Sequence, residues 1–292
     1  MNRIKGILYA AVSSSTFGLA PFFSITLLLA GFSAFEVLSY RWGVASIVLI
    51  VFGWLSGCNF RLAGKDWGVV FLLSLLRAVT SFSLIIAYQN IASGVASTIH
   101  FMYPLAVALA MMFFFREKKS LLVILAVLMS LLGAALLSLG ELEAKSGNTM
   151  VGLVAACVSV FSYAGYIVGV RTTRAVQINS TALNCYVMGL GTIFYLIGAY
   201  CTSGLQLVSD GYTWLIILGL ALPATAISNI TLVQAIKYAG PTLTSILGAM
   251  EPLTAVVIGV FVFKELFTVN SAVGIILILL AVSIVVFRRQ KS

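Results

Sequence analysis

The sequence predicts an all-α integral membrane protein in which ten transmembrane helices form two inverted five-helix repeats. Three observations predict it: an apolar composition, ten apolar stretches of membrane-spanning length, and an internal duplication. The chain of 292 residues is 61% hydrophobic and 9% charged, and its mean hydropathy is +1.13. Soluble domains carry about 25% charged residues, so this composition indicates a chain folded in a lipid bilayer.

Ten apolar stretches are each long enough to cross the roughly 30 Å hydrocarbon core of a bilayer. They cover residues 5–29, 35–56, 67–88, 92–115, 121–140, 149–170, 180–202, 212–236, 240–263 and 269–287. Arg3 and Lys5 precede the first stretch, as basic residues precede a signal peptide. Its apolar part runs from Gly6 to Ala30 and is longer than a signal h-region, so we expect an uncleaved first helix.

The basic residues set the expected orientation. With the N-terminus inside, 13 of the 17 lysines and arginines fall on cytoplasmic loops or termini. Lys145 and Lys264 fall on the other side, and Arg41 and Arg77 lie inside spans. This bias predicts that both termini are cytoplasmic. Short loops and the uncleaved first helix favour a multi-pass protein of the cell inner (plasma) membrane.

The duplication is carried by two similar segments. Met102-Tyr103-Pro104-Leu105, followed by Phe113 to Glu117, matches Met250-Glu251-Pro252-Leu253, followed by Phe261 to Glu265. Subtracting 102 from 250 gives an offset of 148 residues, and the same offset aligns the other pairs. The repeats are expected over residues 1–145 and 146–292. Because five helices per repeat is an odd number, the second repeat enters from the opposite side, an inverted arrangement found in secondary transporters.

These features together resemble the EamA-type transporters of the drug/metabolite transporter superfamily. The resemblance covers the whole chain and is carried by the ten spans, the Met-Glu-Pro-Leu of the ninth span and the Lys-Glu at its end. It implies a carrier, usually an exporter, of amino acids or other small metabolites. It also implies a central cavity lined by the first, third, fourth, sixth, eighth and ninth spans. The nearly apolar fifth and tenth spans would pack outside this cavity.

Glu251 and Arg77 are candidate substrate-binding residues. Each lies about ten residues into its span, which the helical rise of about 1.5 Å per residue places near the bilayer midplane. Glu251 could bind a substrate ammonium group or a coupling proton, or it could be a structural link between helices. Arg77 could bind a substrate carboxylate or pair with Glu251. Arg41 lies only six residues after position 35, where its span begins, so snorkelling to the interface explains it.

Two proline kinks lie at matched positions of the fourth and ninth spans. Pro104 and Pro252 cannot donate to the carbonyl groups of His100 and Gly248, so we expect exposed acceptors at similar depth. Interruptions at matched positions point to a transport site, although packed proline kinks also occur in membrane helices. His100 is a weaker candidate as a proton relay, because a satisfied buried histidine is the commoner case.

Polar and aromatic clusters complete the expected cavity. The candidates that share mid-depth positions are Ser14 in the first span, Thr80 in the third, Tyr103 in the fourth, Tyr163 and Tyr166 in the sixth, and Asn229 in the eighth. Such side chains could bind a small polar solute, or could hold neighbouring helices together. Gly165 and Gly169 match a GxxxG pattern, which we interpret as close helix packing rather than a dimer contact.

The predicted function is therefore efflux of a small polar metabolite, amino acids first, by alternating access. Multidrug or cation efflux and metabolite uptake are the alternatives, and protons are a candidate coupling ion. A membrane enzyme or sensor is disfavoured, because the chain has one histidine, no intramembrane aspartate and no long loop. There is no GxxxxGK[ST] loop for ATP and no Cys/His spacing for a metal. We expect no cofactor and no nucleic-acid partner, and the sequence leaves the oligomeric state open.

Overall fold

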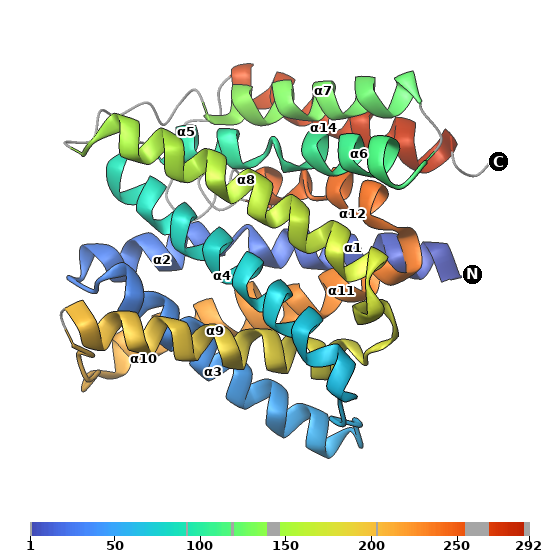
Figure 1. The fold of residues 1–292 in the computed structure, drawn as a ribbon. Coiled ribbons are helices and arrows are strands. Elements are labelled where there is room, and N and C mark those ends of the chain that lie inside the picture. The colour runs from blue at the N-terminus through green and yellow to red at the C-terminus, as the bar shows by residue number, and fades with distance from the viewer. Residues whose placement is uncertain are drawn as a thin grey trace.

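The computed structural model describes residues 2–91, 93–117, 120–138, 147–202, 204–254 and 269–288. Within these ranges the regular secondary structure is entirely helical (Figure 1). The helices of the first half are α1 (Asn2–Phe17), α2 (Ala20–Leu29), α3 (Ala34–Leu55), η1 (Gly64–Asp66), α4 (Trp67–Asn90), α5 (Ser93–His100), α6 (Tyr103–Phe114) and α7 (Leu121–Ser138). Those of the second half are α8 (Thr149–Thr172), η3 (Arg174–Gln177), α9 (Ser180–Thr202), α10 (Gly211–Ala221), η4 (Leu222–Ile227), α11 (Ser228–Ala239), α12 (Pro241–Leu247) and α14 (Val269–Arg288).

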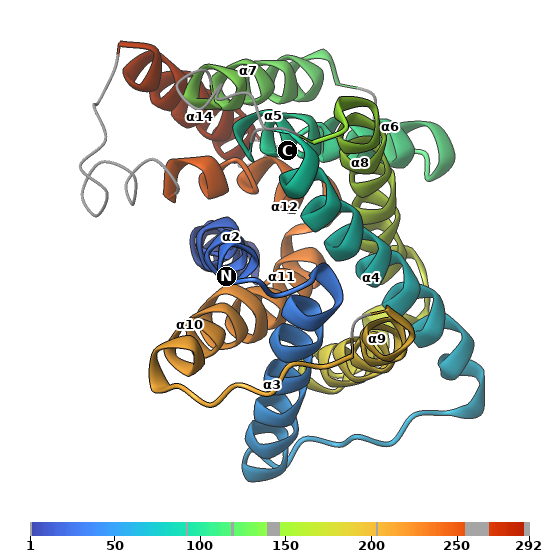
Figure 2. The ribbon, with the colours of Figure 1, turned by 90° about the vertical axis from the view of Figure 1, so that its left-hand side faces the viewer.

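Helices of the two halves pack against each other in matched pairs. The main pairs are α1 with α11, α4 with α8, α3 with α9, and α7 with α14. By position in the repeats, α4 corresponds to α11 and α8 corresponds to α1, so the α4–α8 pair and the α1–α11 pair are equivalent. In the α3–α9 and α7–α14 pairs, each helix packs against its own counterpart in the other repeat. Figure 2 shows α7 and α14 together at the edge of the bundle, away from α3 and α9. The α7–α14 pair is therefore peripheral, as expected for the fifth and tenth spans.

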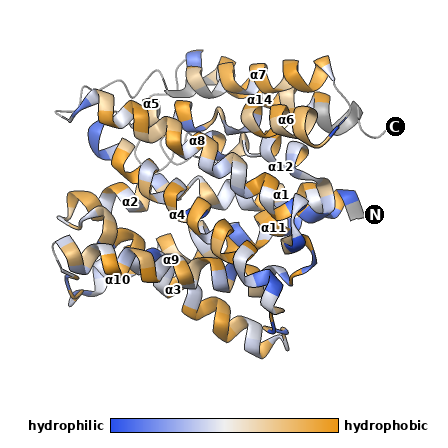
Figure 3. Ribbon diagram, viewed as in Figure 1, coloured by the Kyte–Doolittle hydropathy of each residue, from blue (hydrophilic) through white to orange (hydrophobic). Residues whose placement is uncertain are grey.

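Seven helical segments of the described chain are long and apolar enough to cross a membrane. They are Arg3–Leu29, Ala34–Leu55, Gly64–Asn90, Val95–Phe114, Thr149–Thr172, Ser180–Thr202 and Gly211–Ala239. The apolar parts of α7 and α14 are shorter, at Leu121–Gly133 and Ala272–Ile284. The expected ninth span, 240–263, is described only as far as residue 254. Figure 3 shows apolar residues along the outer helices, and many large apolar side chains there are exposed, as lipid contact requires.

Four of the ten expected spans are interrupted, and a proline lies at each interruption. The first span breaks between α1 and α2 just before Pro21, and the fourth breaks between α5 and α6 just before Pro104. The eighth contains the π-helical turn η4, which includes Pro223. The ninth has a turn at residues 248 and 249, ahead of Pro252. A proline removes one backbone donor and crowds the preceding turn, so each break begins as a local effect of sequence.

Small residues allow the paired helices to approach closely. A Cβ atom on Gly169 would lie 2.8 Å from a methyl carbon of Leu73, so α8 packs tightly on α4 at this point. A Cβ on Gly165 would lie 3.5 Å from Leu76 on the same helix. The GxxxG pattern thus serves close packing within the chain, as the sequence indicated.

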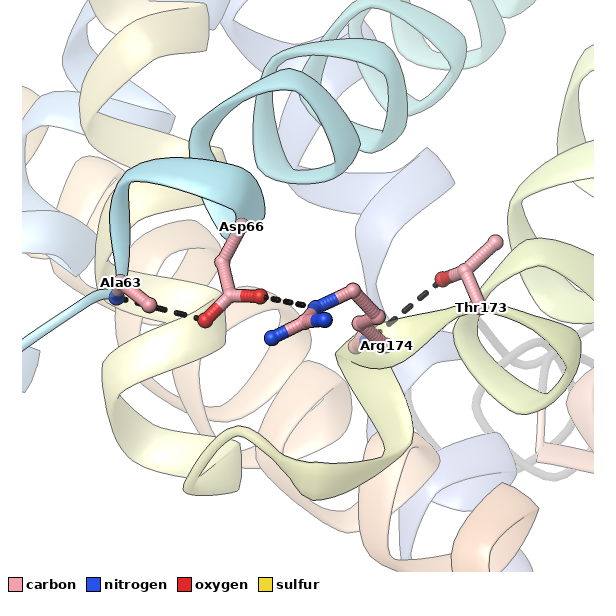
Figure 4. A network of polar contacts seen from close by, with 5 residues as sticks. Ala63, Asp66, Thr173 and Arg174 are labelled. Carbon is pink, nitrogen blue, oxygen red and sulfur yellow. Dashed lines mark hydrogen bonds and ion pairs between the residues drawn. The ribbon is translucent and has the colours of Figure 1, made fainter.

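Polar contacts connect loops at the helix ends. Asp66 accepts a hydrogen bond from the Ala63 backbone and forms an ion pair with Arg174, with Nε 2.7 Å from Oδ1 (Figure 4). This pair joins the start of α4 to the segment after α8. The first residues of α1 and the last residues of α14 lie at the same side of the molecule (Figure 1).

Candidate functional site

Two buried arginines lie at the centre of the bundle. Arg77 of α4 is 2% exposed and Arg41 of α3 is 5% exposed. Arg77 Nε donates to Asn229 Oδ1 at 3.1 Å, and Arg41 Nε donates to Thr225 Oγ1 at 2.7 Å. The expectation that Arg41 snorkels to the interface is wrong. The side chain of Arg41 finds a partner in the π-helical turn η4 and stays inside the protein.

Aromatic rings contact both guanidinium groups. The ring of Phe17 has its centroid 5.3 Å from the Arg77 guanidinium carbon and 5.5 Å from that of Arg41. Tyr163 and Tyr166 of α8 lie 4.8 and 5.8 Å from the Arg77 carbon. Faces of aromatic rings attract cations and replace part of the lost hydration. Phe17 is the last residue of α1, so the ring that contacts both arginines lies directly before the helix break.

A narrow pocket adjoins the arginines. It holds about 20 Å³ of free volume, which is enough for about one water molecule. Its lining comes from α1, α2, α3 and α4, and includes Phe17, Arg41, Arg77, Thr80 and Ser81. The lining also includes Tyr88, which is near the C-terminal end of α4. The pocket therefore extends from the arginines toward that end of the helix. This conformation therefore offers a site that is nearly closed.

Glu251 lies beside the break of the first span. It is 7% exposed, and a Cβ atom on Gly18 would come within 2.7 Å of its carbonyl oxygen. Arg77 is close enough to act electrostatically on its carboxylate, but the two do not form an ion pair within 4 Å. The proposed Glu251–Arg77 pairing is therefore a longer-range interaction.

The breaks of the fourth and ninth spans meet at Tyr103. A Cβ atom on Gly248 would lie 1.7 Å from the Tyr103 hydroxyl oxygen, so only glycine leaves room for this side chain. The expectation that Pro252 leaves the Gly248 carbonyl exposed is wrong. Its oxygen accepts from the backbone N–H of Glu251 at 2.9 Å, because the chain tightens into a shorter turn there.

His100 lies in an aromatic cluster next to this contact. Its ring stacks on Tyr163 with centroids 5.3 Å apart, and its Nδ1 lies 2.9 Å from Ser159 Oγ. The Ser159 hydroxyl donates its one proton to the Ala156 carbonyl at 2.6 Å, so Nδ1 of His100 must be the donor to Ser159. The other ring nitrogen, Nε2, is then an acceptor. It is buried without a hydrogen-bond partner in the described chain, as is the Tyr166 hydroxyl.

The other predicted residues lie around this centre with differing roles. Thr80 lines the pocket and hydrogen-bonds to Ser162, and Ser14 is buried in α1. Asn229 positions Arg77 and is itself anchored, since its side chain donates to the Thr225 carbonyl at 2.7 Å. The neighbouring Ser13 is structural, because it exchanges hydrogen bonds with Ser228 of α11.

Sequence reasoning missed the central place of Thr225 and Asn184. Asn184 of α9 is fully buried and donates to the Asn229 carbonyl at 3.1 Å. The available signal was an amide side chain inside an apolar span, where a polar group is costly unless it has a partner. Phe17 gives only a weak sequence signal, because aromatic residues are common throughout the chain. Among the described residues, no three His, Cys, Asp or Glu side chains are grouped so as to hold a metal ion.

The fold and the buried polar centre define a multi-pass helical membrane protein. A family model described as the EamA-like transporter family matches residues 4–139 and again residues 150–287. The chain therefore belongs to this transporter family, within the drug/metabolite transporter superfamily, whose members act on small molecules in lipid membranes.

Solved structures share the fold. One crystal structure is similar over 97% of this chain and 96% of its own length, with a TM-score of 0.78 and 17% sequence identity. At this identity the likeness concerns the fold alone. No curated protein sequence matches the chain significantly.

Proposed function

We propose that the protein is a secondary transporter that exports a small polar metabolite, most favourably an amino acid, by alternating access. Its ten membrane helices form two inverted repeats, spanning residues 1–145 and 146–292, and both termini are cytoplasmic in the inner membrane. The substrate binds at the centre formed by Arg41, Arg77 and Glu251. One observation supports this proposal above the others: four interrupted helices meet at that centre.

The contacts between the interruptions form a continuous chain. The π-helical turn of the eighth span binds Arg41 through Thr225, and Arg41 faces Phe17 at the break of the first span. The neighbouring Gly18 packs on the Glu251 backbone, and Gly248 of the ninth span packs on Tyr103 of the fourth. Discontinuous helices at mid-membrane are typical of transport sites, because they present polar groups to a solute and can bend there.

Movement of the two repeats is the proposed mechanism. The hairpin of the third and fourth spans would rock against the hairpin of the eighth and ninth around the site. At the end where the fourth span finishes and the ninth begins, Thr242 Oγ1 donates to Glu117 Oε2 at 2.6 Å. The narrow pocket lies on the opposite side of the arginines. This arrangement fits a state that is closed toward the predicted cytoplasm.

Glu251 is the proposed site of proton coupling or of contact with a substrate ammonium group. It is a buried carboxylate near the break of two spans, with no described cation within ion-pair distance. A carboxylate in such surroundings can exchange a proton or an ammonium partner as the site opens and closes.

The test is transport by purified protein in liposomes. We expect counterflow of a radiolabelled amino acid, with the rate of Glu251→Gln reduced at least about 10-fold and its dependence on pH altered. Asp210→Asn is the matched control, because asparagine keeps the N-cap acceptor for Thr213 at a surface position. Unchanged rate and pH dependence in Glu251→Gln would exclude Glu251 from coupling, while wild-type counterflow would still support transport.

The same assay separates the alternatives. Lipophilic cations are disfavoured as substrates, because two buried guanidinium groups at the centre repel a cation. Transport of dyes such as ethidium without transport of amino acids would favour multidrug efflux. Accumulation of the amino acid inside the liposomes only when an imposed proton gradient points inward would favour metabolite uptake.

A further inference from the structure

We propose that Arg41 and Arg77 together form an anion subsite that binds the carboxylate group of the transported substrate. This inference rests on the proposed transport function and names the chemical class of the substrate. It assigns to Arg41 the same role as Arg77, and it gives Phe17 the role of a cover over both.

Both guanidinium groups keep their terminal nitrogens available. In each, the Nε atom makes the hydrogen bond to the neighbouring helix, to Asn229 in one case and Thr225 in the other. Within the described chain, neither residue has a further hydrogen bond from its terminal nitrogens. Both residues line the same pocket. The Nε bonds fix the planes of the guanidinium groups, so their free ends are preorganised for a ligand.

The charge at the site also favours binding of an anion. Two guanidinium groups are buried within 5.5 Å of the centroid of one aromatic ring, that of Phe17, yet the described residues supply no carboxylate within 4 Å of either. Burying a charge without a partner is costly, and neutral side chains and ring faces replace only part of its hydration. A bound anion would supply the missing partner for both.

A carboxylate suits this subsite better than phosphate. The terminal nitrogens of each guanidinium group lie in one plane and present parallel N–H donors. A carboxylate is also planar, and it accepts two parallel hydrogen bonds from a guanidinium group.

Phe17 must move for the subsite to fill. The pocket has room for about one water molecule, and the Phe17 ring lies within 5.5 Å of both guanidinium carbons. Phe17 ends α1 directly before the break at Gly18. Bending at this break is therefore the movement that would expose the arginines to a substrate.

The first part of the test compares acids with their amides on the wild-type protein. Purified protein is melted with alanine, leucine, alaninamide, leucinamide, acetate and inorganic phosphate, and the same compounds compete in counterflow. Ligands that bind the folded state raise the melting temperature by mass action. We expect at least one amino acid to bind about 10-fold or more tightly than its amide.

The second part uses substitutions. Arg77→Gln and Arg41→Gln should each weaken binding of the acid about 10- to 100-fold, the range for loss of hydrogen bonds to a charged group, and abolish the preference for acid over amide. Arg77→Lys keeps the charge but loses the planar fork, so it serves if the glutamine variants do not fold. Arg61→Gln, on an exposed loop, is the control and should behave as wild type.

The outcomes distinguish the two proposals. Equal binding and transport of acid and amide, insensitive to both arginines, would overturn the carboxylate subsite and leave transport standing. Binding of phosphate alone would overturn the carboxylate assignment as well. Absence of counterflow for all acids, amides and cationic dyes would count against the transport function itself.

Discussion

Gly248 is the residue of the site that tolerates the least change. A Cβ atom there would lie 1.7 Å from the Tyr103 hydroxyl oxygen and 2.9 Å from its Cζ. Gly248→Ala should therefore lower stability by about 1–3 kcal/mol, the usual cost of overpacking, seen as a lower melting temperature. Adding Tyr103→Phe removes the closest atom and should recover part of the loss.

The control for this prediction is Gly68→Ala on α4. A Cβ atom there would meet no atom within 4 Å, so the melting temperature should be unchanged. A double-mutant cycle measures the coupling between Gly248 and Tyr103. Equal losses in Gly248→Ala and in the double variant would show that the clash is not the cause.

The protonated nitrogen of His100 is a second prediction at the residue scale. Because Ser159 donates to Ala156, the histidine proton should reside on Nδ1, and Nε2 should carry the lone pair. Nitrogen-15 chemical shifts of selectively labelled protein report this tautomer directly. Ser159→Ala removes the acceptor and should raise the population with the proton on Nε2. A proton found mainly on Nε2 in the wild-type protein would contradict the assignment.

The two arginines show what sequence reasoning can and cannot settle for one residue. Depth in a span identified Arg77 as a candidate, and the structure buries its side chain. The same argument assigned Arg41 to the interface, because depth alone gives no information about partners. The partner of Arg41 is Thr225, which lies 184 residues further along the chain, and no local pattern predicts such a contact.

At the scale of elements, two tightly packed glycines allow the helices of the site to be compared with the peripheral helices. A Cβ atom on Gly18 would lie 2.7 Å from the Glu251 carbonyl oxygen and 2.8 Å from the Thr254 Cβ. Gly18→Ala should push the first span away from the ninth and reduce transport per folded molecule about 10-fold or more. Counterflow measured after normalising for folded protein checks this prediction.

Gly133 on α7 is the matched comparison. A Cβ atom there would lie equally close to α14, at 2.7 Å from the Gly274 carbonyl oxygen. Gly133→Ala should lower the melting temperature but leave transport per folded molecule near that of wild type, because the α7–α14 pair is peripheral. Similar losses of transport in both variants would mean that the outer pair takes part in the movement.

The sequence predicted where most helices lie but not how the spans are interrupted. Hydropathy located α3, α8 and α9 to within a few residues, because long apolar stretches have one stable form in lipid. The structure has breaks shortly before Pro104 and Pro252. The break at Gly18 and the π-helical turn at Leu222–Ile227 were not predicted. A proline removes a donor, but neighbouring helices decide whether the chain kinks, tightens or widens.

At the scale of the whole molecule, side-chain contacts hold the two repeats together at one end. Thr242 donates to the Glu117 carboxylate at 2.6 Å, and Arg174 Nε forms an ion pair with Asp66 Oδ1 at 2.7 Å. At the other end, Tyr40 and the Gln206 backbone form a contact of 2.5 Å. Alternating access requires that such contacts break in turn. The contacts at one end should therefore be formed in one conformational state and broken in the other.

Removing the contact between Thr242 and Glu117 should shift this equilibrium toward the state that is open at that end. A hydrogen bond to a charged acceptor contributes about 1.5–3 kcal/mol, so Thr242→Val should increase the open population about 10- to 100-fold. Labelling of Ser14→Cys by a membrane-impermeant maleimide, with the four native cysteines replaced, measures this opening in inside-out vesicles. Thr244→Val is the control, because the buried Thr244 hydroxyl has no hydrogen-bond partner in the described chain. It should leave the labelling rate unchanged, whereas faster labelling in both variants would mean that general loosening of α12, rather than loss of the contact with Glu117, opens the protein.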